Sequence, residues 1–563
     1  MVVITSYEFI YLLPILILGS AIIILLLLLS LCRINTKLSA WFTIFCLVLS
    51  LASSSYIGYK FISQSDDKIL VANNLTQNID KVINNPTEIN DDINEAASAD
   101  QQLQEINTVA LASPTINDDL SVQEELLKPH SHSTALFTSD GYGALYTSLI
   151  LFLSIIISTL ALTWFKNERT PRGSFYLLVL FSALGATILI YSSHLVSFFI
   201  GIELLSLTIV GLVGYQYTQK YSLEATIKYM VLSAISTIFL LMGIAFYYAA
   251  TGELTFIGLS FKLSTLSAPS ILLLLGVCLM LVGIGFKLSY VPFQLWLPDV
   301  YQGAPACVCL LLTTIGKVAI FCAIARLFLL APIVNNETIR AIMMIMAFCS
   351  IIWGNIFSIK QHNIKRLLAY SSIAHLSYLL VALIAVQYQV LALETIGIYL
   401  IGYMLANVCV LGVISLESSS SANLDHDNDV DLTGLFWRRP IIALAMGIGL
   451  LSLAGIPLTV GFIGRFSLIL LSVTAELWWF VGTVVIVSAF SLYFYLRLAI
   501  NLYIKPDHIL RNEVHKTLTI SKIRQISINE IFIISSALLI ILCGIYPKWL
   551  FNLVSIAQYL MPQ

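Results

Sequence analysis

The chain contains fourteen stretches of mostly apolar residues, and no other feature limits its fold as strongly. A helix that crosses the hydrocarbon core of a bilayer needs about 20 such residues. The stretches lie at approximately 8–31, 38–61, 143–164, 174–193, 195–217, 223–250, 270–296, 304–330, 338–358, 367–388, 391–415, 440–472, 477–503 and 529–551. The sequence therefore predicts an all-α polytopic membrane protein with about 14 transmembrane helices.

The composition excludes a soluble protein. Hydrophobic residues make up 58% of the chain and charged residues 11%, whereas soluble domains average roughly 45–50% and about 25%. Nucleic-acid binding would require a basic groove with aromatic side chains, and no basic cluster is longer than a short loop. The nine cysteines all lie in apolar runs, which indicates small core residues and neither a disulfide framework nor a metal site.

The distribution of Lys and Arg predicts the orientation. Basic residues gather in the loops that follow odd-numbered stretches, as Lys360, Lys365 and Arg366 do after the ninth, and the other loops are nearly free of them. Short loops rich in Lys and Arg remain in the cytoplasm. We therefore predict that both termini lie on the side of the membrane opposite the cytoplasm.

Residues 63–142 form a polar insert between the second and third stretches. It contains fourteen Asp and Glu against three Lys, with many Asn, Ser and Gln. Low hydrophobicity with net negative charge predicts disorder or short, weakly held helices on the periplasmic side; a buried functional insert is the alternative. Residues 417–439 form a second polar connection, on the cytoplasmic side.

Ionisable residues inside the predicted spans are the most informative in the chain. At the bilayer centre each costs on the order of 2.5–3.5 kcal/mol. The candidates are Glu203, Glu224, Lys228, Lys287, Lys317 and Arg465. One interpretation is that they form ion pairs that lock helices together, with lysines extending to the interface. Glu224 and Lys228 have an i, i+4 spacing near the edge of a span, and they fit the ion-pair interpretation as well as a functional one.

Lys287 and Lys317 favour a functional interpretation, because both lie deep in long uncharged runs. Burial disfavours the charged form of a lysine, so such a residue can exchange a proton near neutral pH, and a nearby carboxylate opposes this effect. A row of lysines with one modulating glutamate therefore predicts a proton relay.

Prolines interrupt two of the spans that carry buried charges. Pro292 and Pro298 follow Lys287, and Pro457 lies eight residues before Arg465. A proline inside a span releases backbone groups that protein or water must satisfy. Broken helices beside buried charges are typical of ion sites in transporters.

The other polar positions are weaker candidates. His375 in the tenth stretch can relay protons, and a hydrogen-bonded core histidine is a nearly equal alternative. Arg326 is expected to extend outward to the interface. The sequence has no P-loop, no Gly-x-Ser-x-Gly and no His-Glu-x-x-His motif. We therefore expect no cofactor and no metal in this chain.

Several motifs together resemble one family. The segment Gly285–Pro305, which ends in Asp299-Val-Tyr-Gln-Gly-Ala-Pro305, is similar to the signature of the antiporter-like membrane subunits of respiratory complex I (NADH-quinone oxidoreductase), and most of all to subunit N. Ser222–Tyr229, Gly354-Asn355 and Asn363–His375 carry the same resemblance, in the same order. The likeness covers nearly the whole chain apart from 63–142.

The resemblance implies two inverted five-helix repeats and discontinuous seventh and twelfth helices. The implied organisation is 1–62 (helices 1 and 2), 63–142 (insert), 143–173 (helix 3 and a loop), 174–330 (first repeat), 331–503 (second repeat) and 504–563 (a loop and helix 14). It also implies that Glu203 pairs with Lys228, that Lys287 is the central lysine, and that Lys317 is the helix 8 lysine.

Two positions depart from the family pattern. Arg465 lies where the family usually has the lysine that passes protons outward, and arginine effectively cannot lose its proton in a protein. It is therefore expected to be a fixed charge. Gln294 stands where relatives often have a histidine, so this position cannot titrate.

The resemblance implies a proton-translocating membrane subunit of NADH-quinone oxidoreductase in a bacterial inner membrane, with both termini periplasmic. The resemblance implies that FMN, iron–sulfur clusters and quinone are bound by partner subunits, and that this chain contacts other membrane and peripheral subunits, lipid and protons. Two alternatives stay open: a subunit of a multisubunit cation/proton antiporter, and a structural scaffold whose charges only pair helices.

Overall fold

The computed structural model describes residues 10–31, 35–84, 132–134, 136–165, 172–217, 219–259, 271–331, 335–386, 391–418, 427–505 and 527–559; side chains at 64–84, 132–133 and 556–559 are excluded. Residues 85–131 of the predicted insert at 63–142, and most of the basic loop after the thirteenth span, lie outside the described residues. The fold is all-α and polytopic, as predicted. The only sheet in the described ranges is the two-stranded antiparallel pair β1–β2.

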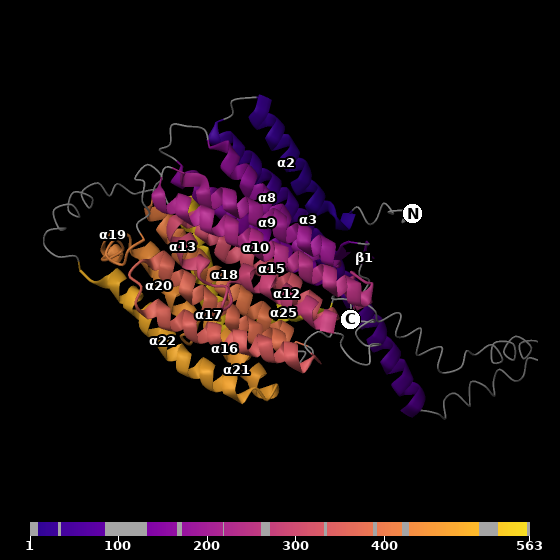
Figure 1. The fold of residues 1–563 in the computed structure, drawn as a ribbon. Helices are drawn as coiled ribbons and strands as arrows, with labels where there is room; N and C mark the ends of the chain where they lie inside the picture. Colours follow the sequence, from indigo (N-terminus) through magenta and orange to yellow (C-terminus); the bar gives the residue numbers. More distant parts are fainter. Residues whose placement is uncertain are drawn as a thin grey trace, which may run out of the picture.

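The helices form one bundle, with later elements layered successively on earlier ones (Figure 1). The elements of the first half are α2 (Leu13–Leu31), α3 (Thr36–Asn84), β1 (His132–Ser133), β2 (Thr138–Ser139), α7 (Gly141–Trp164), α8 (Gly173–Tyr191), α9 (Leu195–Val213), η1 (Gly214–Gln216), α10 (Lys220–Thr251), α12 (Ile271–Leu288), α13 (Trp296–Gly303), α14 (Ala306–Leu311), the π-helical turn η2 (Leu312–Gly316) and α15 (Lys317–Leu330). The elements of the second half are α16 (Glu337–Ile359), α17 (Ile364–Ile384), α18 (Leu391–Glu417), α19 (Leu435–Arg438), α20 (Pro440–Ala454), α21 (Val460–Thr474), α22 (Trp478–Tyr503), α24 (Ile528–Ile545) and α25 (Lys548–Tyr559).

Every predicted span corresponds to a helix. Among the described residues, thirteen helical segments are long and apolar enough to cross a membrane, and the two shorter helices α20 and α21 occupy the remaining stretch. Two boundaries differ from the prediction. α3 continues to Asn84, far beyond its apolar part. The last span ends at Ile545, because Pro547 cannot continue a helix and α25 begins after it.

The seventh and twelfth spans are interrupted, as predicted. The backbone of Ser289 lies in the left-handed region (φ 63°) after α12, the Val291–Pro292 peptide is cis, and the helix resumes as α13. In the other span α20 ends at Gly455 (φ 76°) and α21 begins at Val460. Each break falls in the fourth span of a predicted repeat; the inverted relation between the repeats stays a prediction.

Two glycines allow α20 and α21, the two halves of the twelfth span, to pack closely at the break. A Cβ on Gly461 would lie 1.8 Å from the carbonyl oxygen of Ser452, so a side chain at this position would force α20 and α21 apart. A Cβ on Gly455 would meet the side chain of Arg465 at 2.7 Å. The absence of a side chain at these two positions therefore lets α20, α21 and the side chain of Arg465 pack closely at the break.

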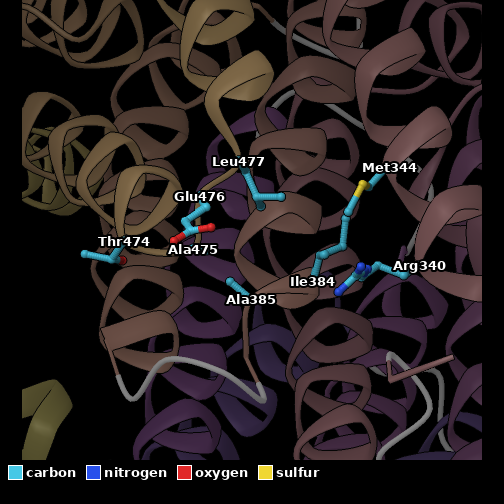
Figure 2. Close-up of a pocket in the computed structure, with 8 residues that line it drawn as sticks. All are labelled: Arg340, Met344, Ile384, Ala385, Thr474, Ala475, Glu476 and Leu477. Atoms are coloured by element: carbon cyan, nitrogen blue, oxygen red, sulfur yellow. The ribbon is translucent and has the colours of Figure 1, made fainter. Parts of the chain in front are cut away.

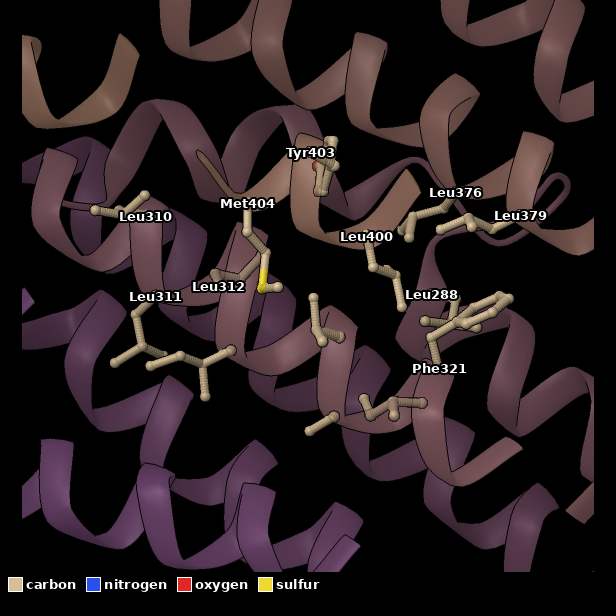
Figure 3. Packing of buried hydrophobic residues seen from close by; sticks show 14 of the residues in the cluster. Leu288, Leu310, Leu311, Leu312, Phe321, Leu376, Leu379, Leu400, Tyr403 and Met404 are labelled. Carbon is tan, nitrogen blue, oxygen red and sulfur yellow. The ribbon is translucent and has the colours of Figure 1, made fainter. Parts of the chain in front are cut away.

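The central helices are enclosed by protein. The apolar parts of the spans that contain α15, α17 and α18 are 100%, 94% and 94% buried inside the protein. The apolar parts of α10 and α22, at the edge of the bundle, are each 33% buried. Figure 3 shows the apolar packing at this centre, where Leu312 lies beside Met404 of α18 and Phe321 lies by Leu288. Polar side chains in this region are therefore shielded from bulk water and lipid.

Candidate functional site

Lys287 is the penultimate residue of α12, immediately before the break in the seventh span. Its side chain is 5% exposed, and its Nζ donates to Ser206 Oγ of α9 and Ser233 Oγ of α10, each at 2.7 Å. A cation at a helix C-terminus also interacts favourably with the helix dipole. Lys287 is thus held by two hydroxyl groups, with no carboxylate in ion-pair contact among the described residues.

Glu203 lies one helical turn before Ser206 on α9, and its carboxylate is close enough to Lys287 for the two charges to interact. The carboxylate accepts a hydrogen bond of 2.5 Å from Thr237 Oγ1 of α10. The expected pair between Glu203 and Lys228 is not formed in this structure. The physical reason is that Lys228 has two nearer carboxylates at the edge of the bundle.

Lys228 lies at the beginning of α10, where its Nζ is 2.7 Å from Glu224 Oε1 and 2.7 Å from Asp299 Oδ2. The predicted proximity of Glu224 and Lys228 on one helical face is confirmed. Asp299, in α13, also contacts Arg366 of α17 at 3.1 Å. Its side chain is 31% exposed and that of Lys228 is 41% exposed, so this cluster is only partly removed from solvent.

Sequence reasoning did not single out Asp299. It belongs to the motif that carried the family resemblance, in the half-helix that follows the break, and it is charged in an otherwise apolar segment. Together, these two features could have identified Asp299 as a candidate site residue. Its contact with Lys228 joins residues 71 positions apart, which no local pattern reveals.

Lys317 is the first residue of α15, and the π-helical turn η2 directly precedes it. π-Helical turns are rare in proteins, and many of those that do occur lie at functional sites. The side chain is 2% exposed, its Nζ donates to Ser372 Oγ of α17, and it lies 5.7 Å from the centre of the Tyr301 ring. As with Lys287, the partner of this buried ammonium is a hydroxyl group.

His375 follows Ser372 by three residues on α17 and therefore lies on the same helical face. Its Nδ1 is 2.7 Å from the Tyr399 hydroxyl of α18, and its Nε2 is 3.2 Å from the Tyr495 hydroxyl of α22. Both ring nitrogens thus have a phenol partner. The histidine is part of a hydrogen-bonded chain and also a well-satisfied core residue, as both interpretations expected.

Arg465 is bound at the end of the half-helix α20. Its guanidinium donates to the carbonyl of Ala454 at 2.6 Å, to that of Leu453, and to Ser491 Oγ at 3.1 Å. Carbonyls at the C-terminus of a helix have no partner within the helix and carry partial negative charge. A permanent cation with several donors in a planar fork suits this position.

The buried residues Lys287, Lys317, His375 and Arg465, which lie on α12, α15, α17 and α21, are called the row below, together with the hydroxyl groups that they contact. α17 connects its two halves, because it presents Ser372 to Lys317 and places the Tyr378 ring 5.9 Å from Arg465. The hydroxyls of Tyr378 and Tyr403 and Oε1 of Gln294 are buried and have no hydrogen-bond partner within the described part of the chain. Buried polar groups of this kind are usually satisfied by ordered water.

Arg326 does not extend outward as expected. It is 1% exposed, and its guanidinium donates to Asp140 Oδ1 at 2.7 Å and to the carbonyl of Thr138 at 3.1 Å. The same carboxyl oxygen of Asp140 caps α7 by accepting from Gly143 N–H at 2.7 Å. The prediction for Arg326 is wrong because its partner lies in the last residues of the insert region, which the sequence indicated to be weakly ordered.

No group of three or more His, Cys, Asp or Glu side chains in the described part of the chain is placed to bind a metal ion. The seven predicted residues are therefore divided as follows. Glu203 lies one helical turn before Ser206, which contacts Lys287. Lys228 and Glu224 lie in the partly exposed cluster with Asp299. Lys317 contacts α17, the helix on which His375 lies, and Arg465 stands at the far end of the row.

The family described as NADH:quinone oxidoreductase/Mrp antiporter, transmembrane, matches residues 192–491, a span that includes all seven predicted residues. The chain belongs to this family. It is an antiporter-like membrane protein that crosses the bilayer many times.

Solved structures share the fold over nearly the full length. A chain of respiratory complex I from Thermus thermophilus is 25% identical, with a TM-score of 0.70 over 96% of this chain and 98% of that one. A chain of the archaeal membrane-bound sulfane sulfur reductase is 19% identical, with a TM-score of 0.69 over 97% and 96%. A chain of the Mrp complex from Dietzia sp. DQ12-45-1b is 15% identical, with a TM-score of 0.71 over 98% and 97%. The last two similarities concern the fold alone.

Proposed function

We propose that this chain is a proton-translocating membrane subunit of NADH-quinone oxidoreductase, of the subunit N type. The observation that carries the proposal is the pairing of Lys287 and Lys317 with serine hydroxyls in the protein interior. A lysine kept only to lock two helices together would be expected to face a carboxylate, because an uncompensated buried charge is costly. The family match and the likeness to a complex I chain support the same assignment.

Hydroxyl partners allow a lysine to change its charge. A serine oxygen accepts a hydrogen bond from an ammonium group, and its O–H can donate to the neutral amine. Ser206, Ser233 and Ser372 can therefore stabilise Lys287 and Lys317 in both protonation states. A carboxylate would hold the lysine in its charged form.

In the proposed relay protons enter at the cluster of Lys228, Glu224 and Asp299, which is half-exposed at the end predicted to face the cytoplasm. They continue to Lys287 and then to Lys317. Glu203 lies one helical turn from Ser206, a partner of Lys287, so movement of a second cation toward Glu203 would change the electrostatic environment of this lysine.

From Lys317 the proposed path follows α17. Ser372 and His375 lie on one face of that helix, and the imidazole contacts the hydroxyls of Tyr399 and Tyr495. Arg465 carries no proton in this scheme. Its fixed charge opposes a second positive charge on His375, so a proton that arrives there is driven onward through hydroxyls and water.

The redox chemistry would take place elsewhere in the assembly. FMN, iron–sulfur clusters and quinone are proposed to be bound by partner membrane and peripheral subunits, which supply the energy that drives the lysines through their charge states. The bacterial inner membrane and periplasmic termini belong to the same proposal. The second candidate is a subunit of a multisubunit cation/proton antiporter, which the family match favours equally, since the family includes the Mrp antiporters.

Purification of the tagged chain in mild detergent distinguishes the two candidates. The first candidate predicts that subunits with FMN and iron–sulfur clusters co-purify and that the preparation reduces quinone with NADH. A stable multisubunit assembly without these centres, active in cation/proton exchange, would assign the chain to the antiporter class. A chain with neither activity, in vesicles where the relay residues can be neutralised without effect, would leave only the scaffold interpretation.

Asp299 provides a specific test of the entrance cluster. We expect Asp299→Asn to lower proton translocation about three- to fivefold, because a partly exposed ion pair contributes at most about 1 kcal/mol and Lys228 retains one carboxylate. The measurement is acid uptake into inverted vesicles, with NADH oxidation followed in parallel. Glu337→Gln, which removes an exposed carboxylate at the far end of the bundle, is the matched control. Unchanged translocation in Asp299→Asn would remove this residue from the path.

A further inference from the structure

A groove opens at the end of the bundle where α16 begins, well away from the lysine row. It lies between the first turn of α16, the end of α17 and the turn that joins α21 to α22 (Figure 2). Its lining residues are Arg340, Met344, Ile384, Ala385, Thr474, Ala475, Glu476 and Leu477. Neither the family resemblance nor the proposed relay gives this groove a role.

The groove has opposite charges on its two sides. Figure 2 shows Arg340 on one side and Glu476 on the other, with Ala385 between them. Among the described residues, neither charged side chain takes part in an ion pair. The surface between them is apolar and is formed in part by Ile384 and Met344. A ligand that fits must therefore carry a negative and a positive group and tolerate an apolar surface.

The backbone of Glu476 indicates that its carboxylate has a role in the groove. α21 ends in a Schellman motif, in which Leu477 N–H donates to the Ser472 carbonyl at 2.8 Å and Glu476 N–H to the Val473 carbonyl at 3.1 Å. The residue at the position of Glu476 in this motif is usually glycine, because its backbone is left-handed; here φ is 58°. Glu476 thus adopts a backbone conformation that is unfavourable for a residue with a side chain, which suggests that its carboxylate has a role at this position.

The groove lies at the level of lipid headgroups. Trp478 and Trp479, the first residues of α22, are 65% and 44% exposed beside it. Tryptophan is enriched where a membrane protein meets the boundary between hydrocarbon and water. α16 and α22 run along one edge of the bundle (Figure 1), and Ile345 and Ile486 on these helices are 62% and 63% exposed. Apolar surface suited to acyl chains thus extends from the groove.

We propose that this groove binds the headgroup of a phospholipid with a primary ammonium group, a phosphatidylethanolamine. The Arg340 guanidinium binds the phosphate, for which its planar fork is well matched. The Glu476 carboxylate, which can only accept, binds the ammonium, which can only donate. The acyl chains lie against the exposed faces of α16 and α22. A choline headgroup carries the same charges but has no N–H to donate, so the site discriminates between the two lipids.

The test uses the full chain in nanodiscs that contain equal amounts of phosphatidylethanolamine and phosphatidylcholine. Lipids that remain bound after release from the nanodisc are counted by native mass spectrometry. The wild type is expected to retain phosphatidylethanolamine preferentially. Glu476→Gly is expected to lower that preference about fivefold, because a charge-assisted hydrogen bond at a partly exposed site is lost. Arg340→Gln is expected to reduce retention of both lipids.

Glu476→Gly also separates ligand loss from misfolding. Glycine is the residue that the left-handed position favours, so the melting temperature of this variant should equal or exceed that of the wild type. The control variants Glu337→Gln and Lys548→Gln remove exposed charges outside the groove and should retain lipid normally. Equal retention of the two lipids by the wild type, or an unchanged preference in Glu476→Gly, would overturn the proposal. So would cross-linking that places a partner subunit in the groove of an assembly without bound lipid.

Discussion

Substitution of Lys317 by methionine is expected to lower proton translocation at least about tenfold, since removal of a proton-transferring group typically costs about 10²–10⁴-fold in rate where that step limits turnover. The physical reason is that the proposed path reaches α17 through Lys317, whose Nζ donates to Ser372 Oγ of that helix. Methionine is comparably long and unbranched, and loss of a buried charge removes its desolvation cost. The complex should therefore still assemble.

The substitution Lys317→Arg tests whether Lys317 transfers protons or only provides a fixed positive charge. Arginine keeps the positive charge but does not release its proton, so a relay predicts loss of translocation in both variants, whereas a purely electrostatic role predicts loss in Lys317→Met alone. Acid uptake by inverted vesicles is measured at matched subunit content. Lys60→Met is the control, because Lys60 lies 5.2 Å from the Tyr11 ring at the edge of the bundle and outside the row. Normal translocation in Lys317→Met would contradict the proposed path.

The Asp140–Arg326 pair should have the largest effect on stability. Its side chains are 0% and 1% exposed, and Asp140 also caps α7. Removal of one partner of a buried ion pair leaves an uncompensated charge and costs about 3–5 kcal/mol. We therefore expect Arg326→Met to lower the yield of folded protein severely, measured by monodispersity in detergent and by thermal unfolding.

A double variant shows whether the pair or the individual side chains are responsible. Asp140→Asn keeps an oxygen that can cap the helix but removes the charge. In combination with Arg326→Met, it should recover a large part of the stability lost in Arg326→Met, because no buried charge remains. A double variant no more stable than Arg326→Met would show that the unpaired Asp140 charge does not cause the loss of stability. The contact of the guanidinium with the Tyr142 ring, whose centre is 5.5 Å away, would then be the alternative cause.

Much of the fold could be predicted because, in a membrane, the position of each spanning helix depends mainly on the residues of that segment. An uninterrupted apolar run of sufficient length becomes a spanning helix wherever its neighbours lie. Pro292 and Pro457 marked the two interrupted spans for the same reason, since a proline breaks the helix in which it stands. The high cost of charge in lipid identified Lys287, Lys317 and Arg465 as residues that the protein must enclose, and all three are buried.

The partners of these charges were decided only by the tertiary structure. Lys228 faces Asp299 across 71 residues, and Arg326 faces Asp140 across 186. Hydropathy shows that a charge must be satisfied but does not show by which group, because many carboxylates and hydroxyls meet that need equally well. The choice depends on which helix faces pack together, and this is a property of the assembled bundle. The sequence alone thus determined the spans, their breaks and the buried charges, and tertiary packing determined that Lys287 and Lys317 contact serine hydroxyls.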